Sequence, residues 1–376
     1  MQSRSLGLAA SYIRGGTSKG VYLRRENLPQ DTSDWKPILL GIMGSPDPEY
    51  GRQLDGMGGG VSSLSKVCVV GAASPEQREQ GIEVDYTFVG IRDDAIDFSG
   101  NCGNLSSMIG AYALDEGLID RRSGLDKRTV RSYNTNTQKI IDTTFPVDED
   151  GRPLLNLLQA SVAGVPGKAS EILLDFVNPA GARTGRLLPT GAPVDRSSAG
   201  PSALDMTCID ATNPTIFVAT DEVRSHLPLG AYLRGESPAL SQVGKALEAL
   251  RQDGARKMGL NPAAQAQPKI AMLSAPAPGD DADIVVHALS MGVLHKAVPM
   301  TLGLCLGVAA NVEGTIAHRL VREARAREQR EDGRLVRIRH PGGTVDVGAE
   351  FSEDGSVKSA RVVRTGRILM KGSVSY

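Results

Sequence analysis

Short runs of β-branched and other apolar residues, each bounded by glycine, proline, asparagine or aspartate, recur through almost the whole chain. Such runs are typical of β-strands, and the 43 glycines and 21 prolines fit the many turns between them. The chain is therefore expected to be rich in strands. We predict strands at residues 9–13, 20–24, 65–70, 82–89, 139–144, 172–177, 206–209, 215–219, 269–274, 283–288, 335–338 and 362–368.

Helical periodicity is clearest at 104–116 and 240–251, while a third predicted helix, 299–308, is apolar on every side and should be buried. The 376 residues exceed the roughly 250–300 at which one hydrophobic core stops growing, so two domains are expected. Each half would hold many strands and one mostly apolar helix, as copies of one plan would. We place the domains of this α+β protein at residues 1–190 and 191–376.

The best candidate boundary is the polar, proline- and glycine-containing segment 178–201, which could equally be a folded substrate loop. The run 319–334 alternates basic and acidic residues and is interpreted as a solvated helix or surface loop, with a partner site as the alternative.

Charge and cysteine spacing exclude several classes of function. The formal net charge is −1 with both signs interspersed, so the chain lacks the basic field that binds nucleic acid or an acidic membrane. No run of about 18 apolar residues predicts a membrane span. The four cysteines lie far apart without a C-x-x-C pair, which argues against zinc and a disulfide scaffold and favours the cytoplasm.

Three glycine-rich polar clusters could bring backbone close to a ligand: RGGTSKG at 14–20, DGMGGGVSSLSK at 55–66 and SGNCGN at 99–104. In the first, Arg14 and Lys19 flank a tight turn whose amides could bind a carboxylate, although a hairpin with solvated charges explains it equally well. Its order of residues does not match a P-loop, and 56–61 lacks the third glycine of a dinucleotide fingerprint.

Lys66 ends the second cluster and enters an apolar strand, where desolvation would favour a neutral amine able to act as a base. The alternative is a lysine whose stem packs while its head reaches water. Cys102 precedes the predicted helix 104–116, and the positive end of a helix favours a thiolate. The other cysteines lie in apolar runs typical of packing residues, although Cys305 could be a counterpart of Cys102 in the second half.

These clusters, in order, resemble the PrpF family. The resemblance rests on RGGTSKGV at 14–21, GSPDP at 44–48, RQLDGMGG at 52–59, SK at 65–66, GNCGN at 100–104, LPTG at 188–191, NPTIF at 213–217, RKMG at 256–259, SMGVLH at 290–295, HPGG at 340–343 and RTGRILM at 364–370. The family includes 2-methylaconitate cis-trans isomerase, 3-methylitaconate Δ-isomerase, 4-oxalomesaconate tautomerase and aconitate Δ-isomerase.

The resemblance implies a diaminopimelate-epimerase-like fold, in which two similar domains each curl a sheet around a central helix and the active site lies in the cleft between them. It also implies that Lys66 and Cys102 are the acid/base pair of an isomerase that needs no metal and no organic cofactor. Ala192 follows Pro-Thr-Gly where many members carry asparagine, so the substrate stays open among these unsaturated acids.

The expected reaction is a 1,3-allylic or cis-trans isomerisation of a small polycarboxylate, by one base or two, through a dienolate. Two or three substrate carboxylates would need cations and hydroxyls. A homodimer is the default assembly. The predicted binding residues are Arg14, Thr17, Ser18, Lys19, Arg52, Ser63, Ser65, Asn101, Gly103, Asn104, Ser106 and Thr190, with His295 and His340 as further ligands or relays.

Two alternative functions stay open. A racemase or epimerase of the same fold would need a second acidic thiol facing Cys102, for which only Cys305 is plausibly placed. A small-acid binding or sensor protein would keep the cleft without the chemistry, and the presence of Lys66 and Cys102 argues against it.

Overall fold

In the computed structural model the chain forms two compact units, Met1–Asp175 with Val363–Tyr376 (unit 1) and Phe176–Val362 (unit 2). The structure describes residues 7–98, 100–199, 203–265, 267–290, 292–331, 333 and 335–376. Ser99 of the third glycine-rich cluster and the ends of the 178–201 and 319–334 segments lie outside the described residues.

This division differs from the predicted one, which placed the domains at residues 1–190 and 191–376. The C-terminal strand β18 (Gly366–Val374) pairs with β1 (Leu8–Gly15), so backbone hydrogen bonds return the end of the chain to unit 1. The segment 178–201 begins inside unit 2 as a folded loop, in which Gly181 N donates to Asp210 O at 2.8 Å. The chain passes from unit 1 to unit 2 within β8 (Ile172–Val177) and returns within β17 (Val357–Arg364).

Both units build their sheets in one order. The first two strands pair antiparallel, and the third pairs parallel with the second. The fourth pairs antiparallel with the third and with a short fifth strand. The sixth pairs parallel with the fourth, and the seventh pairs antiparallel with the sixth. In unit 1 these are β1, β2 (Ser18–Arg24), β3 (Lys66–Ala72), β4 (Val84–Arg92), β5 (Ala95–Asp97), β6 (Lys127–Asn134) and β7 (Lys139–Pro146). In unit 2 they are β10 (Asp205–Ala211), β11 (Asn213–Ala219), β12 (Lys269–Ser274), β13 (Ile284–Ser290), β14 (Val293–Leu294), β15 (Leu335–His340) and β16 (Gly343–Phe351), with β9 (Asp195–Arg196) beside β10.

The similarity of the two units extends to an equivalent ion pair between side chains. Arg131 of β6 pairs with Asp142 of β7 through Nε and Nη2 at 2.9 and 2.8 Å. Arg337 of β15 pairs with Asp346 of β16 through the same nitrogens at 2.8 and 3.1 Å. Because both pairs stand directly opposite on equivalent strands, the two units are copies of one plan, as the sequence predicted.

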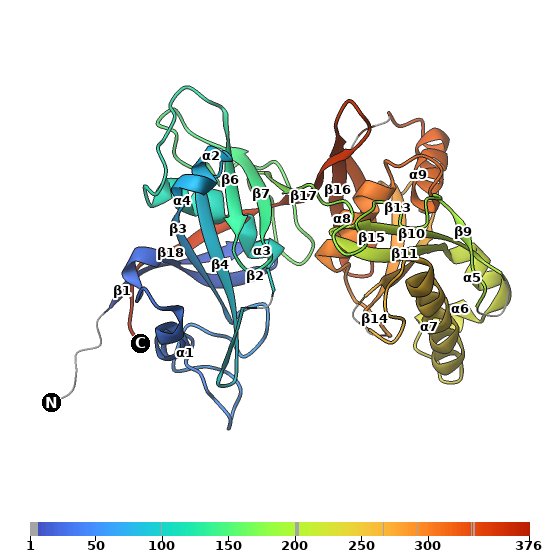
Figure 1. The fold of residues 1–376 in the computed structure, drawn as a ribbon, viewed down its shortest axis with the longest axis horizontal. Helices are drawn as coiled ribbons and strands as arrows, with labels where there is room; N and C mark the ends of the chain where they lie inside the picture. The colour runs from blue at the N-terminus through green and yellow to red at the C-terminus, as the bar shows by residue number, and fades with distance from the viewer. Residues whose placement is uncertain are drawn as a thin grey trace. The chain divides into compact units, whose positions relative to one another are not determined.

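Each sheet curls around a central helix. In unit 1, α3 (Gly103–Ser106) contacts β1 and β2 while α4 (Ile109–Asp115) contacts β4, β6 and β7. In unit 2, α8 (Met300–Ala309) contacts β10, β11, β15 and β16 and is buried over nearly all its length, as its all-round apolar sequence predicted. A helix that touches both ends of a sheet must lie inside its curl, so the predicted α+β architecture is confirmed (Figure 1).

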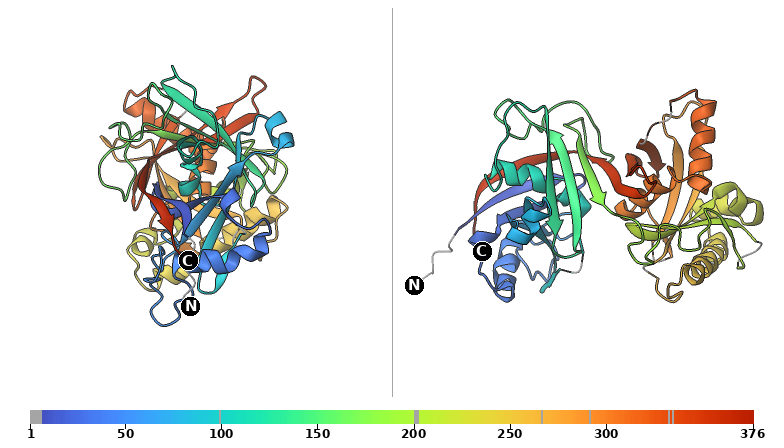
Figure 2. Two further views of the ribbon diagram at one scale, coloured as in Figure 1. Left: turned by 90° about the vertical axis from the view of Figure 1, so that its left-hand side faces the viewer. Right: turned by 45° about the horizontal axis from the view of Figure 1, so that its top comes forward.

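Other helices cover the outer faces of the sheets. α1 (Trp35–Met43) packs Trp35, Leu39 and Ile42 against β2, β3 and β4 in unit 1. In unit 2 the long helix α7 (Ala239–Lys257) lies along β10 and β12 with α5 (Thr220–His226) and α6 (Leu229–Leu233) beside it (Figures 1 and 2). Smaller helical segments are η1 (Arg25–Asn27), η2 (Thr32–Asp34) and α2 (Pro75–Glu79).

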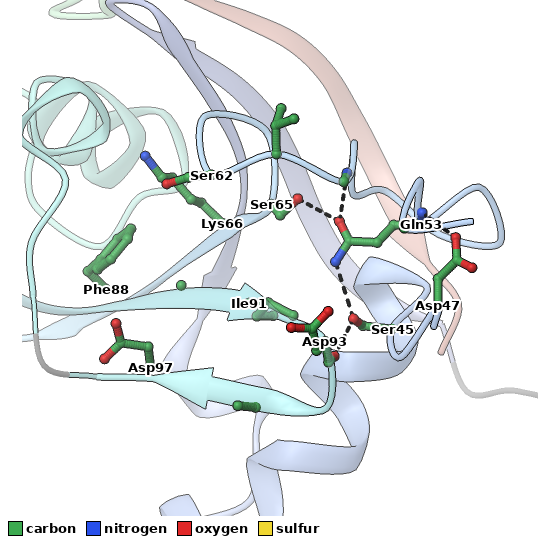
Figure 3. Close-up of a pocket in the computed structure, with 15 residues that line it drawn as sticks. Ser45, Asp47, Gln53, Ser62, Ser65, Lys66, Phe88, Ile91, Asp93 and Asp97 are labelled. Carbon is green, nitrogen blue, oxygen red and sulfur yellow. Dashed lines mark hydrogen bonds between the residues drawn. The ribbon is translucent and has the colours of Figure 1, made fainter. Parts of the chain in front are cut away.

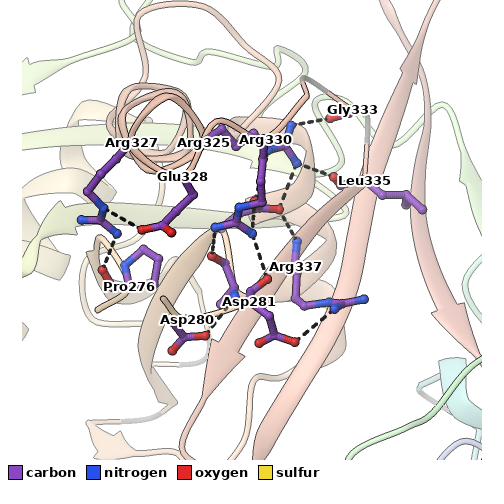
Figure 4. A network of polar contacts seen from close by, with 12 residues as sticks. Pro276, Asp280, Asp281, Arg325, Arg327, Glu328, Arg330, Gly333, Leu335 and Arg337 are labelled. Atoms are coloured by element: carbon purple, nitrogen blue, oxygen red, sulfur yellow. Dashed lines mark hydrogen bonds and ion pairs between the residues drawn. The ribbon is translucent and has the colours of Figure 1, made fainter. Parts of the chain in front are cut away.

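Three predicted elements change in the structure. The predicted helix 104–116 is divided into α3 and α4, and the predicted strand 362–368 is two strands that meet at Thr365. The run 319–334 contributes to a true helix, α9 (Ile316–Arg327), but it is not wholly solvated. Arg325 is buried and donates to Asp283 at 3.2 and 2.9 Å and to Leu335 O at 2.6 Å (Figure 4).

Candidate active site

Lys66 begins β3 on the face of the sheet that packs against the central helix. The next residue, Val67, points to the opposite face and packs with α1, so strand alternation directs the lysine inward. Its Nζ lies 3.2 Å from Cys102 Sγ and 3.4 Å from Ser18 Oγ. Nζ also lies 5.9 Å from the centroid of the Phe88 ring. The structure therefore brings together the amine and the thiol that the sequence singled out.

Cys102 is the N-cap of α3 and is 8% exposed. Its carbonyl accepts a hydrogen bond from Ser106 N at 2.9 Å, which starts the helix. Beneath the turn, Ser106 Oγ donates to Asn101 Oδ1 at 2.9 Å and lies 2.7 Å from Tyr86 OH. Asn101 and Ser106 thus hold the start of α3 in place, where Gly103 is the first helical residue.

The hydroxyl of Ser18 is the point where these groups meet. Ser18 is 2% exposed and its Oγ lies 3.7 Å from Cys102 Sγ. Asn104 donates from Nδ2 to Thr17 Oγ1 at 3.1 Å and to Ser18 Oγ at 3.5 Å. Thr17 is exposed at the tip of the β1–β2 hairpin. Four of the predicted residues, Ser18, Lys66, Cys102 and Asn104, therefore form one polar cluster.

The glycines of the first cluster allow the hairpin to approach the central helix. A Cβ on Gly20 would lie 2.8 Å from both the Lys66 carbonyl oxygen and Leu105 Cδ1. A Cβ on Gly15 would meet the Asn104 carbonyl, and Gly16 has a φ of +48°, which disfavours any other residue. Glycine at these positions is what lets Ser18 reach the thiol.

The three predicted carboxylate-binding cations lie elsewhere. Arg14 Nη1 donates to Gly16 O at 2.9 Å and to Thr365 O at 3.1 Å, so backbone carbonyls already use it. Burial, followed by the charge of Arg367, lowers the pKa of Arg14. Lys19 alternates with Ser18 along β2 and places Nζ 5.8 Å from the Tyr12 ring. Arg52 is exposed in the loop that follows α1.

That loop forms one wall of a pocket of about 640 Å³ beside Lys66 (Figure 3). Gln53, which is 4% exposed, accepts from Ser65 Oγ at 2.5 Å and donates to Ser45 Oγ at 3.2 Å. Ser63 acts through its backbone, because its carbonyl accepts from Lys19 N at 2.9 Å. Ser65 and Ser63 therefore fix the loop, and Gln53 is a structural residue that sequence reasoning missed.

Three carboxylates also line the pocket, those of Asp47, Asp93 and Asp97. Hydrogen bonds from the amides of Arg52, Tyr50 and Gln53 lower the pKa of Asp47, which therefore stays ionised. Lys66 lines the same pocket, so an amine and three carboxylates line one space.

The remaining predicted residues belong to unit 2. Thr190 Oγ1 donates to Asp195 Oδ2 at 2.8 Å. His295 is exposed, with Nδ1 2.7 Å from Ala297 O. His340 is 9% exposed and its Nδ1 accepts from Gly342 N at 3.1 Å. Each of these three side chains has a local partner within its own unit.

Arg364, the last residue of β17, is the other polar group that the sequence did not assign to the site. It is 8% exposed and its Nε donates to Asn104 Oδ1 at 3.0 Å. The hydrogen bond fixes the orientation of the amide, so that Asn104 Nδ2 points toward Ser18. Only the family motif RTG drew attention to this position, which lies 260 residues away from Asn104 in the chain.

Within the described parts of the chain, histidine, cysteine, aspartate and glutamate side chains form no group of three that could hold a metal ion. No described helix combines the length and the apolarity that a membrane span requires.

Known proteins are similar to this chain over nearly its whole length. The model of the family described as PrpF protein matches residues 6–376. The 3-methylitaconate isomerase of Eubacterium barkeri is 34% identical over 96% of this chain and 95% of its own length. The 2-methyl-aconitate isomerase of Shewanella oneidensis is 36% identical over 98% of this chain and 96% of its own length.

A third relative, the 4-oxalomesaconate tautomerase of Pseudomonas putida, is 32% identical over 96% of this chain and 94% of its own length. The crystal structure of a methylitaconate Δ-isomerase superposes with a TM-score of 0.85 at 32% identity, covering 99% of this chain and 96% of that one. The polar cluster thus sits in a fold shared with an isomerase of known structure, and the chain belongs to the PrpF family.

Proposed function

We propose that this isomerase moves a proton within an unsaturated di- or tricarboxylic acid, with Lys66 and Cys102 exchanging that proton with the substrate. The observation that carries the proposal is the 3.2 Å separation of Lys66 Nζ and Cys102 Sγ, with Ser18 Oγ in contact with both. An amine and a thiol this close form a pair that holds a transferable proton. The relatives named above are isomerases and a tautomerase of such acids.

In the proposed mechanism, the neutral amine of Lys66 removes a proton from the carbon next to the double bond. The electron pair of the broken C–H bond delocalises through the double bond onto a carboxylate, which gives a dienolate. The thiol of Cys102, or the ammonium just formed on Lys66, then returns a proton at the other end of the allylic system. Polar groups already aimed at the developing charge lower the barrier to such a carbanion.

The charge of the pocket orients the substrate. Asp47, Asp93 and Asp97 line the pocket beside Lys66 and repel carboxylates, whereas Ser18 and Asn104, which are not part of that lining, offer hydrogen-bond donors near Cys102. A polycarboxylate would therefore direct its charged groups toward the hairpin and the start of α3, which presents the carbon skeleton to Lys66.

The test measures solvent proton exchange. The purified enzyme in D₂O would be given 2-methylaconitate, aconitate, methylitaconate and 4-oxalomesaconate, and deuterium wash-in would be followed by proton NMR. We expect turnover and exchange with at least one acid, and a loss of both by about 10²–10⁴-fold in Lys66→Met. Full exchange in that variant would overturn the proposal.

Lys269→Met is the matched control for this experiment. Lys269 begins β12, the unit 2 equivalent of β3, and burial lowers its pKa. If half-buried lysines at this strand position mattered only for packing, both variants would lose activity together. We expect the control to keep turnover within about 3-fold of the wild type.

The alternative racemase function needs a second acidic thiol. Cys305 lies in the middle of α8, fully buried, with Sγ 3.9 Å from Ile209 O. Burial raises the pKa of Cys305 to about 12, so it stays protonated at neutral pH, which weighs against the alternative. We also propose the cytoplasm as the compartment, because all four cysteines are free thiols and a reducing environment preserves them.

A further inference from the structure

Arg364 differs from the other buried arginines of the described residues. Arg128, Arg251 and Arg325 each form an ion pair with a glutamate or aspartate. Arg364 forms hydrogen bonds only with neutral groups, Asn104 Oδ1 at 3.0 Å from Nε and Val363 O at 2.8 Å from Nη1. No described acidic side chain pairs with it.

A buried cation without a counter-ion is costly. Burial lowers the pKa of Arg364 to about 10, and interaction with Cys102 opposes this shift. The guanidinium therefore stays charged at neutral pH, while the loss of its hydration is not offset by an acid. Binding an anion would recover more of that free energy than the two hydrogen bonds to neutral groups do.

The surrounding contacts place this unpaired charge at the reaction centre. Nε is held by Asn104, whose Nδ2 donates to Ser18 Oγ, and Ser18 contacts both Lys66 and Cys102. Nη2 has no hydrogen-bond partner among the described residues, so it is the nitrogen left to donate to a ligand. An anion bound there would be linked to the groups that move the proton through Asn104 and Ser18.

We infer that Arg364 binds a carboxylate group of the substrate and that Asn104 is a positioning residue that holds the guanidinium toward it. This inference rests on the proposed function, and it assigns to Arg364 the role that the sequence gave to Arg14, Lys19 and Arg52. The ligand class is a carboxylate on the carbon skeleton that Lys66 deprotonates, rather than a phosphate or a neutral amide.

The experiment uses an unreactive probe, propane-1,2,3-tricarboxylate, which has the charges of a tricarboxylic substrate but no double bond. Its binding to the full-length protein would be measured by calorimetry. We expect Arg364→Gln to weaken binding by about 10–100-fold, as the loss of a hydrogen bond to a charged group does. Arg367→Gln, at an exposed arginine three residues along the chain, should leave binding unchanged.

A second readout separates recognition from folding. The wild-type enzyme should be protected by the probe against iodoacetamide alkylation of Cys102, and Arg364→Gln should lose that protection while its thermal unfolding stays cooperative. If the glutamine variant does not fold, Arg364→Lys is the second variant. Lysine keeps the positive charge but lacks the planar guanidinium that can bind a carboxylate through two nitrogens, so it should still weaken binding. Unchanged binding in a folded Arg364 variant, or no binding of the probe to the wild type, would overturn the inference.

Turnover distinguishes this inference from the proposed function. Loss of probe binding in Arg364→Gln, with no turnover of any of the four acids by the wild type, would support Arg364 and contradict the isomerase assignment to these acids. Turnover of one of the acids by the wild type, with an unchanged KM in Arg364→Gln, would support the isomerase assignment and contradict the role of Arg364. When both hold, we expect a raised KM with a smaller change in kcat, because the carboxylate is bound in the ground state as well as in the transition state.

Discussion

The two units share one arrangement of strands but differ where the central helix begins. Lys66 starts β3 opposite Gly90, and Lys269 starts the equivalent strand β12. In unit 1 the lysine meets Cys102, the N-cap of α3, whereas α8 of unit 2 begins after Pro299, which offers no side-chain cap. Both units thus carry a lysine at the start of the third strand, and in unit 1 this lysine lies beside a thiol.

The helices themselves show what the thiol requires. α3 is four residues long and gives way to α4 at Ser107–Met108, while α8 continues for ten residues and is apolar throughout. The start of α3 is held by Asn101, Ser106 and Tyr86, all of them polar. The unit with a thiol at the start of its central helix thus has an interrupted helix, and the other unit has a continuous one.

The first prediction compares the two cysteines. Cys102→Ser should lower turnover by about 10²–10⁴-fold, because a hydroxyl is a much weaker acid than a thiol. Cys305→Ser should stay within about 3-fold, since burial holds the Cys305 thiol protonated within α8. Steady-state kinetics with the best substrate measures both. Equal losses would mean that the two helix regions are functionally alike.

The second prediction concerns the acids at the start of the fourth strand in each unit. Asp283 pairs with Arg325 in unit 2, and Glu83 pairs with Arg128 in unit 1. Arg325→Met should destabilise the fold by about 3–5 kcal/mol, because it leaves a carboxylate buried in an ion-pair network with one partner fewer. Arg128→Met should cost less, because the Glu83 side chain is 25% exposed against 8% for Asp283. Urea unfolding provides the comparison.

The pH dependence of stability provides a further test of the pair between Arg325 and Asp283. Burial raises the pKa of Asp283, but hydrogen bonds from Arg325 and from Arg337 N outweigh it and hold the pKa below its ordinary value. A depressed pKa contributes stability above the unfolded pKa of about 3.9 and loses it as the pH falls through the folded value. Arg325→Met should therefore show a smaller loss of stability than the wild type between about pH 4 and the folded pKa. An identical pH profile would contradict the assignment.

The third prediction compares glycines of the two central helices. A Cβ on Gly110 of α4 would lie 2.8 Å from Val130 Cβ and 3.0 Å from Phe145 Cε1, so Gly110→Ala should cost about 1–3 kcal/mol. A Cβ on Gly303 of α8 meets nothing closer than 3.6 Å, so Gly303→Ala should stabilise by up to about 1 kcal/mol through helix propensity. Thermal unfolding distinguishes them, and equal effects would contradict the tighter packing around Gly110 than around Gly303.

Much of the fold could be read from the sequence because strands and buried helices leave local patterns. The predicted strands 172–177 and 269–274 match β8 and β12 to the residue. β6 and β16 were missed, because polar, charged or glycine residues interrupt their apolar patterns. The break at Ser107–Met108 was also invisible, since the apolar periodicity continues through it.

The candidate site was predicted only in part, for a similar reason. Ser18, Lys66, Cys102 and Asn104 lie in glycine-rich clusters whose composition marks them, and the structure brings them together. The sequence could not show which cations are available to bind a substrate. Arg14, for example, donates to the carbonyl of Thr365, which lies near the other end of the chain.

The sequence by itself determined the strand-rich plan, its duplication and the amine–thiol pair, because those depend on local residue patterns and on short motifs. The tertiary structure decided that Ser18 and Asn104 join this pair, that β18 returns the chain to unit 1, and that Arg364 carries the unpaired buried charge. Burial and electrostatic pairing are properties of neighbours in space, and residues 260 positions apart become neighbours only when the chain folds.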